Sequence, residues 1–481
     1  MLLRRFYHDG LAQASYMIGC QKTGEALVVD PHREVEEYVA AAAAEGVRIT
    51  QVSETHIHAD FLSGGRELAA RTGARLLLSD EGGEEWRYHF AVEDGATLLR
   101  GGDSFMVGNV RVDVVHTPGH TPEHLTFVIT DTPSSSHPLG AITGDFLFVG
   151  DVGRPDLLER AADQEGTMRA SAAQLFHSIL HFAATYPDHL QLWPGHGSGS
   201  ACGKALGAVP QTTLGYEKIS NWAFQTTNEE QFITTVLKGQ PDPPRYFATM
   251  KRLNRAGPRL LGAATALTRC APSDLATVLA TNALVLDLRP ADVAAHRFIP
   301  GTLNLPFNQS FVGWAGWLAE YDRDIYLLTD GDGAQTQNAA RELRMIGLDR
   351  VRGWFGPDAF EAWGGNGRAF DAIPQVEATE LDEWLRKGEA SVVDVRAPGE
   401  WHAGHISGAR HAPLGRLSEA LPAMAKGQPL AMQCQGGARS AIAASLAHLH
   451  GFKNVVNLHG GYGAWERAGL PVVQDPSSST V

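Results

Sequence analysis

The sequence SETHIHADFLSGG occupies residues 53–65, and its first four residues end a β-rich run that we expect to be a strand over residues 48–56. His56, His58 and Asp60 have the spacing of metal ligands and would lie at the carboxyl end of that strand. The next position, where a two-metal site of this spacing would need another histidine, holds Phe61, and a phenylalanine cannot bind a metal. This stretch therefore predicts a metal site that lacks one of its usual ligands.

Three further segments carry possible ligands at the ends of predicted strands. They are HTPGH (116–120), TGDF with Asp145, and WPGHG with His196. A single histidine is most often a packing or capping residue. Four segments that all place His or Asp after a strand instead indicate one shared site.

The length and charge of the chain exclude several classes of protein. A chain of 481 residues predicts roughly three domains. The net charge of −14 argues against nucleic acid and anionic membranes as partners, and no apolar run is long enough for a transmembrane helix. Four scattered cysteines without a CxxC pair indicate a reducing compartment, so we expect a cytoplasmic protein, and we also expect a homo-oligomer.

The second half of the chain contains an internal duplication. ALVLDLRPADVAAHRFIPGTLNLPF (283–307) parallels ASVVDVRAPGEWHAGHISGARHAPL (390–414), with Asp287 matching Asp394. Each copy continues as strand, glycine-containing loop and helix, which predicts parallel α/β sheets. We therefore expect an α/β multidomain protein. Its predicted parts are a first domain (1–255), a middle copy (265–370), a C-terminal copy (375–475) and a disordered tail (476–481).

The C-terminal copy contains a loop suited to a reactive thiol, CQGGARS (434–440), between a predicted strand and helix. Backbone N–H groups, the helix N-terminus and Arg439 would all favour the thiolate of Cys434, and Gly437 and Ala438 complete the loop. Such a cradle could hold a transferable sulfur; the alternative is an ordinary buried cysteine. Counting back from Gly347, matched to Gly451, places Asp330 opposite Cys434 and Gln335 opposite Arg439. The middle copy is therefore predicted to be inactive and to act as a spacer, an oligomer contact or a wall of the substrate path.

The four ligand segments resemble the metallo-β-lactamase superfamily, which implies an αββα sandwich with the metal at one edge. A second metal would have only Asp60 and His196, so we expect one metal per chain. Two histidines and a carboxylate with open positions are typical of non-haem Fe(II). Persulfide dioxygenases of this superfamily bind one Fe(II) at the positions of His56, His120 and Asp145, with O₂ as co-substrate. The resemblance also implies supporting or substrate-binding roles for four residues: His58, Asp60, His196 and Arg154.

Residues 375–475 resemble a rhodanese domain, and the whole order resembles bacterial persulfide dioxygenase–rhodanese fusions of the CstB type. The resemblance implies oxidation of a small persulfide to sulfite, followed by sulfur transfer from Cys434 to give thiosulfate, as in sulfide detoxification. Glutathione, coenzyme A, bacillithiol and cysteine persulfides are all possible substrates. Cys202, just after His196, could handle sulfur beside the iron or could be a buried core residue.

Two other functions remain open. One is a zinc-dependent thioester hydrolase of the glyoxalase II kind, fused to a rhodanese, against which Phe61 argues. The other is a non-catalytic sulfur carrier, against which the intact set of His56, His120 and Asp145 argues.

Overall fold

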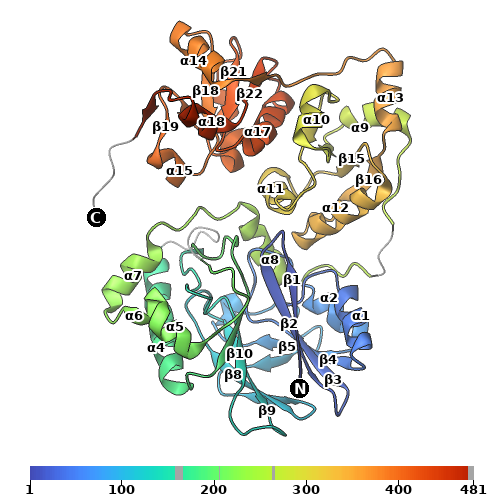
Figure 1. The fold of residues 1–481 in the computed structure, drawn as a ribbon. Helices are drawn as coiled ribbons and strands as arrows, with labels where there is room; N and C mark the ends of the chain where they lie inside the picture. Colours follow the sequence, from blue (N-terminus) through green and yellow to red (C-terminus); the bar gives the residue numbers. More distant parts are fainter. Residues whose placement is uncertain (158–165, 205, 263–265, 475–481) are drawn as a thin grey trace. The chain divides into compact units, whose positions relative to one another are not determined.

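A computed structural model of the chain describes residues 1–157, 166–204, 206–262 and 266–474 (Figure 1). The chain divides into a first unit, Met1–Ala264 with Leu343–Gly347, and a second unit that contains the rest. The predicted disordered tail, 476–481, lies outside the described residues. Among the helices of the described ranges, none combines the length and the apolar character that crossing a bilayer requires.

The described part of the first unit contains two six-stranded sheets with helices on their outer faces. The first sheet has the order β1 (Leu2–His8), β2 (Gln13–Cys20), β3 (Glu25–Val29), β4 (Arg48–Ser53), β5 (Arg75–Ser79), β6 (Thr97–Leu99). The second has the order β12 (Thr212–Thr213), β11 (Gln191–Pro194), β10 (Gly140–Gly144), β9 (Leu125–Asp131), β8 (Val110–His116), β7 (Ser104–Val107). The helices are α1 (Glu36–Ala44), α2 (Gly65–Thr72), α4 (Met168–Thr185), α5 (Leu214–Ser220), α6 (Trp222–Gln225), α7 (Glu229–Leu237) and α8 (Tyr246–Ala256).

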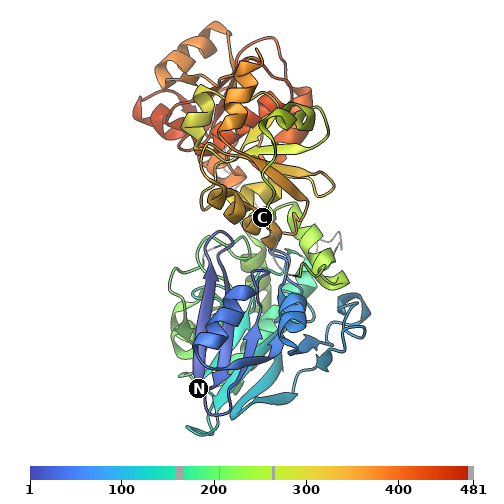
Figure 2. The ribbon, with the colours of Figure 1, turned by 90° about the vertical axis from the view of Figure 1, so that its right-hand side faces the viewer.

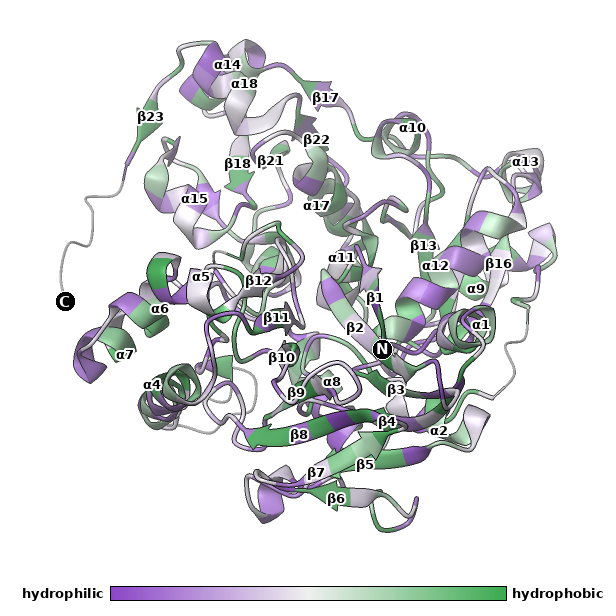
Figure 3. Ribbon diagram, turned by 60° about the horizontal axis from the view of Figure 1, so that its bottom comes forward, coloured by the Kyte–Doolittle hydropathy of each residue, from purple (hydrophilic) through white to green (hydrophobic). Residues whose placement is uncertain are grey.

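The two sheets face each other because each has one continuous apolar face. Alternate residues of β8 are buried, and they pack with residues of β2, β3 and β9 into one core. Figure 3 shows hydrophobic segments along β8. Figure 2 shows α1 and α2 in front of the first sheet. On the second sheet, α4 buries Leu175, Ile179 and Phe182, which lie on one helix face. The predicted αββα sandwich is confirmed.

The strand ends of this sandwich bring the predicted ligand segments together. β4 ends at Ser53, three residues earlier than expected, so His56 lies in a loop rather than in the strand. His120, Asp145 and His196 follow the ends of β8, β10 and β11. Loops at the edge of the two sheets therefore carry the site.

The second unit contains both copies of the duplication, each built on a parallel sheet, as predicted. The middle copy has the order β14 (Thr302–Asn304), β13 (Leu284–Asp287), β15 (Ile325–Leu328), β16 (Val351–Phe355). The C-terminal copy has the order β17 (Gln375–Val376), β22 (Val455–Leu458), β21 (Leu430–Gln433), β18 (Ser391–Asp394), β20 (Arg410–His411), with a separate antiparallel pair β19 (His405–Ile406) and β23 (Val472–Val473).

Helices surround both sheets of the second unit. In the middle copy they are α9 (Leu275–Leu279), α10 (Ala291–His296), α11 (Phe311–Leu318), α12 (Gly333–Met345) and α13 (Asp358–Gly365). In the C-terminal copy they are α14 (Ala378–Lys387), α15 (Pro398–Ala403), α16 (Leu417–Ala420), α17 (Ala438–Leu449) and α18 (Gly461–Arg467).

Candidate functional site

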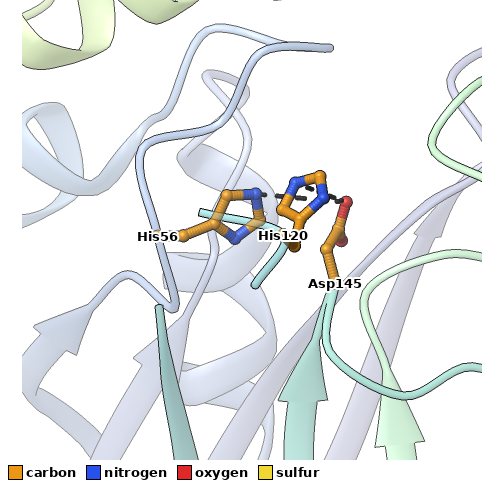
Figure 4. A group of neighbouring side chains, drawn as sticks. All are labelled: His56, His120 and Asp145. Atoms are coloured by element: carbon orange, nitrogen blue, oxygen red, sulfur yellow. Dashed lines mark ion pairs between the residues drawn. The ribbon is translucent and has the colours of Figure 1, made fainter. Parts of the chain in front are cut away.

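The side chains of His56, His120 and Asp145 point toward one another in a buried cluster (Figure 4). One ligand atom from each lies within 4.8 Å of the others. Asp145 Oδ2 is 3.4 Å from His120 Nε2 and 4.0 Å from His56 Nε2. The structure thus brings together the three residues that were predicted to bind the metal.

The chemistry of this cluster fits a divalent cation. Within the described residues, His56 Nε2 and both carboxylate oxygens of Asp145 are buried without a hydrogen-bond partner, which is costly unless a cation satisfies them. Burial lowers the pKa of His56 and also that of His120, so both imidazoles are neutral, the form that binds metals. These three residues would hold the metal.

Both histidines are oriented by hydrogen bonds at their other ring nitrogen. His120 Nδ1 lies 3.1 Å from the carbonyl oxygen of Arg154, and His56 Nδ1 lies 3.0 Å from the hydroxyl of Thr55. Thr55 in turn donates to Asp30, which has a left-handed backbone (φ 54°) that aspartate tolerates better than most residues. Each Nε2 is thereby left to face the cluster.

His58 belongs to a different group of side chains. Its Nε2 lies 3.0 Å from Asp30 Oδ1 and 3.2 Å from Glu54 Oε2. Burial opposes protonation of this imidazole, but Asp30 and Glu54 outweigh it and raise the pKa of His58 well above its usual value. Its Nδ1 is buried and has no hydrogen-bond partner among the described residues. His58 therefore remains a predicted supporting residue, now with identified partners.

Asp60, His196 and Cys202 form another buried group in which one ligand atom from each lies within 4.8 Å of the others. His196 Nε2 is 3.2 Å from Asp60 Oδ2 and 3.4 Å from Asp145 Oδ1, so this group adjoins the first cluster. The sequence offered only Asp60 and His196 for a second metal, and the structure adds a third donor, Cys202. Burial raises the pKa of the Cys202 thiol to about 12, so without a metal the thiol stays protonated.

Arg154 supports both groups and is itself completely buried. Its guanidinium bonds both oxygens of Asp156 at 2.8 and 2.7 Å and donates to the carbonyl oxygens of Ala201 and Pro241. Its own carbonyl oxygen lies within hydrogen-bond distance of His120. Arg154 thus ties the Cys202 loop to a predicted metal ligand, which favours the supporting role over substrate binding.

Sequence reasoning missed Asn254, in α8, which holds the loop that opens at His56. Its amide nitrogen donates to the carbonyl oxygens of His58 and Phe61, both at 2.8 Å, and its oxygen accepts from Ser63 N at 2.9 Å. Nothing in the local pattern around Asn254 signals this role, because its partners lie about 190 residues earlier in the chain.

Glu123 was missed as well. One carboxylate oxygen accepts from Ile57 N at 2.8 Å, between His56 and His58, and burial raises the pKa of the carboxyl group to about 7.

Cys434 lies in the loop between β21 and α17, as predicted. Its sulfur accepts from Gly437 N at 3.1 Å and from Ser440 Oγ at 3.3 Å. Gly437 has φ +100°, where a side chain would be strained. Arg439 pairs with both carboxylate oxygens of Glu400 at 2.7 Å and also interacts with Cys434. The arrangement can stabilise negative charge on the sulfur.

The register of the two copies corrects the match at this loop. Asp394 pairs with Gln433 in the C-terminal copy and Asp287 pairs with Leu328 in the middle copy, so Thr329, not Asp330, corresponds to Cys434. Counting back from Gly347 failed because α12 has 13 residues and α17 has 12.

The same strand register also changes which residue of the middle copy corresponds to Arg439. Ala334 takes the place of Arg439, and Gln335 takes the place of Ser440. Gln335 contacts Thr329 Oγ1 at 2.7 Å, much as Ser440 contacts the sulfur of Cys434. A threonine hydroxyl cannot carry a sulfane sulfur, so the prediction of an inactive middle copy stands on this corrected match.

Residues 8–196 match the metallo-beta-lactamase superfamily, and residues 377–468 match the rhodanese-like domain. The chain is 30% identical to the human mitochondrial persulfide dioxygenase ETHE1 over 198 residues, which is 41% of this chain and 68% of that protein. It is 32% identical to a hydroxyacylglutathione hydrolase from Nitrosococcus oceani over 185 residues, which is 38% of this chain and 61% of that protein.

A crystal structure of a metallo-beta-lactamase from Staphylococcus aureus subsp. aureus COL is also similar, with a TM-score of 0.66 and 40% identity. The match covers 74% of this chain and 99% of that one. The chain therefore belongs to the metallo-β-lactamase superfamily, with a first domain homologous to the ETHE1 persulfide dioxygenases and a rhodanese-like domain fused at its C-terminal side.

Proposed function

We propose that the chain is a non-haem Fe(II) persulfide dioxygenase coupled to a sulfurtransferase. The observation that carries this proposal is the buried set of two neutral imidazoles and one carboxylate, His56, His120 and Asp145, with unsatisfied ligand atoms. The net reaction in the first domain is RSSH + O₂ + H₂O → RSH + H₂SO₃. Bound Fe(II) supplies the redox chemistry that activates O₂.

The chain's own residues keep this site dry and ordered. Each of the three ligands has 2% or less of its surface exposed, and Phe61 and Phe148 pack beside the two adjoining groups. Thr55 and the carbonyl oxygen of Arg154 orient the imidazoles. Cys202 lies beside His196, which supports a role for its thiol in handling sulfur near the metal.

The C-terminal copy would perform the second step. The Cys434 thiolate attacks the terminal sulfur of RSSH and forms an S–S bond to it. The S–S bond of the donor breaks, and RS⁻ leaves and takes up a proton. Bisulfite then removes the sulfane sulfur from Cys434, giving thiosulfate and the thiol. Arg439, Gly437 N and Ser440 Oγ would hold the negative sulfur between the two steps. We place this chemistry in the cytoplasm, with a persulfide of glutathione, coenzyme A, bacillithiol or cysteine as substrate.

Anaerobic purification, metal analysis and O₂ uptake with a persulfide test the first step. We expect one iron per chain and uptake that His120→Ala abolishes. His116→Ala is the matched control, because His116 lies in the same segment but its Nε2 faces the carbonyl oxygen of Pro122. Persulfide consumption that survives His120→Ala would instead support a sulfur carrier.

Cys434→Ser tests the second step. We expect unchanged O₂ uptake and a shift of product from thiosulfate to sulfite, whereas Cys270→Ser in the middle copy should leave both products as they are. An unchanged thiosulfate yield in Cys434→Ser contradicts the relay.

A second candidate is a thioester hydrolase of the hydroxyacylglutathione hydrolase kind. The group of Asp60, His196 and Cys202 favours it, because it could hold a second metal beside the first. The same preparations distinguish the two functions: two zinc ions, thioester cleavage and no O₂ uptake would establish the hydrolase.

A further inference from the structure

A cavity of about 300 Å³ lies inside the second unit, between the middle and C-terminal copies. The middle copy contributes the start of α10, the segment that leads into α11, and Gln335 of α12, while the C-terminal copy contributes Ala438, Arg439 and Ile442 of α17. The two copies pack directly at this place: Asn304 N donates to Ser445 Oγ at 2.8 Å, and α17 packs against β14. The cavity is therefore a partly open pocket at a packed interface within the second unit.

The cavity reaches the start of α17, directly after the loop that carries Cys434. Arg439, which lines it, also interacts with Cys434, and Ala438 is the loop residue directly before Arg439. The part of the lining that the middle copy supplies includes Gln335, the residue that takes the place of Ser440 in this copy. Gln335 of the middle copy and the start of α17 in the C-terminal copy thus line the same cavity.

The lining of the cavity selects against charged ligands. Its walls are mostly apolar and include Pro306, Phe307, Trp314 and Ile442. Among the described residues that line it, Arg439 is the single charged one, and it already pairs with both carboxylate oxygens of Glu400. A ligand body with free carboxylates or an ammonium group would lose its hydration here without gaining a partner.

Amide groups and aliphatic carbon suit these walls better. Gln335 and Asn308 contribute side-chain amides to the lining, which can pair with amides of a ligand. A volume of about 300 Å³ is at the lower end for small-molecule sites, enough for one short chain.

We propose that this cavity binds the uncharged, amide-bearing aliphatic arm of a thiol that carries the sulfane sulfur, an arm of the pantetheine kind, with its sulfur toward Cys434. This inference rests on the proposed sulfur transfer at Cys434. It assigns a task to the inactive middle copy, which supplies most of the wall that recognises the donor. The sulfur step itself is the exchange written above, in which the S–S bond of the donor is replaced by one to Cys434.

The test compares sulfur donors on the full chain under anaerobic conditions, because the oxidation step cannot proceed without O₂. Pantetheine persulfide and glutathione persulfide are offered with sulfite as acceptor, and thiosulfate is offered with cyanide as a small reference donor. We expect native protein to prefer pantetheine persulfide over glutathione persulfide in kcat/KM by about tenfold or more.

Ala291→Leu, which fills part of the cavity, should raise KM for pantetheine persulfide about tenfold relative to thiosulfate. Ala362→Leu is the matched control, because Ala362 lies in α13 of the same copy and outside the cavity lining. The proposal is overturned if Ala291→Leu leaves the ratio of KM for pantetheine persulfide to KM for thiosulfate unchanged. It is also overturned if native protein prefers glutathione persulfide to pantetheine persulfide.

A binding measurement separates failure of this site from failure of the sulfurtransferase. Calorimetry of pantetheine with the full-length Cys434→Ser chain should show binding that Ala291→Leu weakens about tenfold. If the native chain transfers sulfur but pantetheine does not bind, the cavity is the wrong site. If pantetheine binds but no donor is used, the cavity assignment holds as a binding site and the sulfurtransferase function is wrong.

Discussion

Replacing Asn254 by alanine should loosen the loop that carries His56 and His58. The side chain is 2% exposed and makes three hydrogen bonds to the backbone of His58, Phe61 and Ser63. Each such bond contributes roughly 1 kcal/mol, and its loss strands a buried backbone group, so we expect the free energy of unfolding of the first unit to fall by about 3 kcal/mol. At about 2 °C per kcal/mol for a unit of this size, Tm should fall by about 6 °C.

Calorimetry of the full chain measures this change in the transition of the first unit, and metal content is measured on the same samples. Asn228→Ala is the control, because Asn228 is exposed and makes one capping bond to Gln231 N at 2.9 Å. That variant should lose about 1 kcal/mol and keep its metal. If Asn254→Ala lowers Tm no more than Asn228→Ala does, the three bonds do not hold the loop and the reasoning is refuted.

Three further changes test the surroundings of the site. Gly153→Ala places a methyl group against the carbonyl oxygen of Asp145, so metal affinity should fall by about 10- to 100-fold in a chelator titration, and unchanged affinity would show that the loop simply shifts. Cys202→Ser should slow persulfide-dependent O₂ uptake, whereas an unaffected rate would make Cys202 an ordinary core residue. Burial raises the pKa of Glu123 to about 7, so the folded protein keeps a proton that the unfolded chain releases between about pH 4.5 and 7, and native stability falls as pH rises through this window. Glu123→Gln removes this loss. In urea unfolding, the free energy of unfolding of the variant should therefore rise relative to that of native protein from about pH 4.5 to about pH 7. A difference between the two proteins that stays constant with pH contradicts the raised pKa of Glu123.

Local patterns predicted the strands, the duplication and the ligand segments, while the sandwich and the choice of the three ligands came from the family resemblance. Strand periodicity and the His and Asp residues after strand ends predicted one shared site, and the resemblance to the metallo-β-lactamase superfamily implied the sandwich. The structure brings His56, His120 and Asp145 together at the edge of that sandwich. The duplication was visible because both copies keep the same strand–loop–helix order. Such features depend on neighbours within a few residues, and a single sequence records them directly.

Side-chain partners that are distant in the chain could not be predicted in this way. HxH spacing leaves open whether His58 faces the metal, and only the fold shows its Nε2 on Asp30 and Glu54. Asn254 reaches its loop across about 190 residues, and Cys202 meets Asp60 only because two separate loops converge.

The middle copy also shows which features local motifs predict and which the tertiary structure decides, here for a single residue. Its relation to the C-terminal copy follows from repeated local motifs, but the residue opposite Cys434 depends on strand register. Because α12 has one extra residue, counting back along the chain from Gly347 matches Asp330 to Cys434 instead of Thr329. Backbone pairing across the sheet gives the correct match because it does not depend on helix length. The sequence by itself therefore determines which types of residue are available for a site, while tertiary packing decides which of their atoms come into contact.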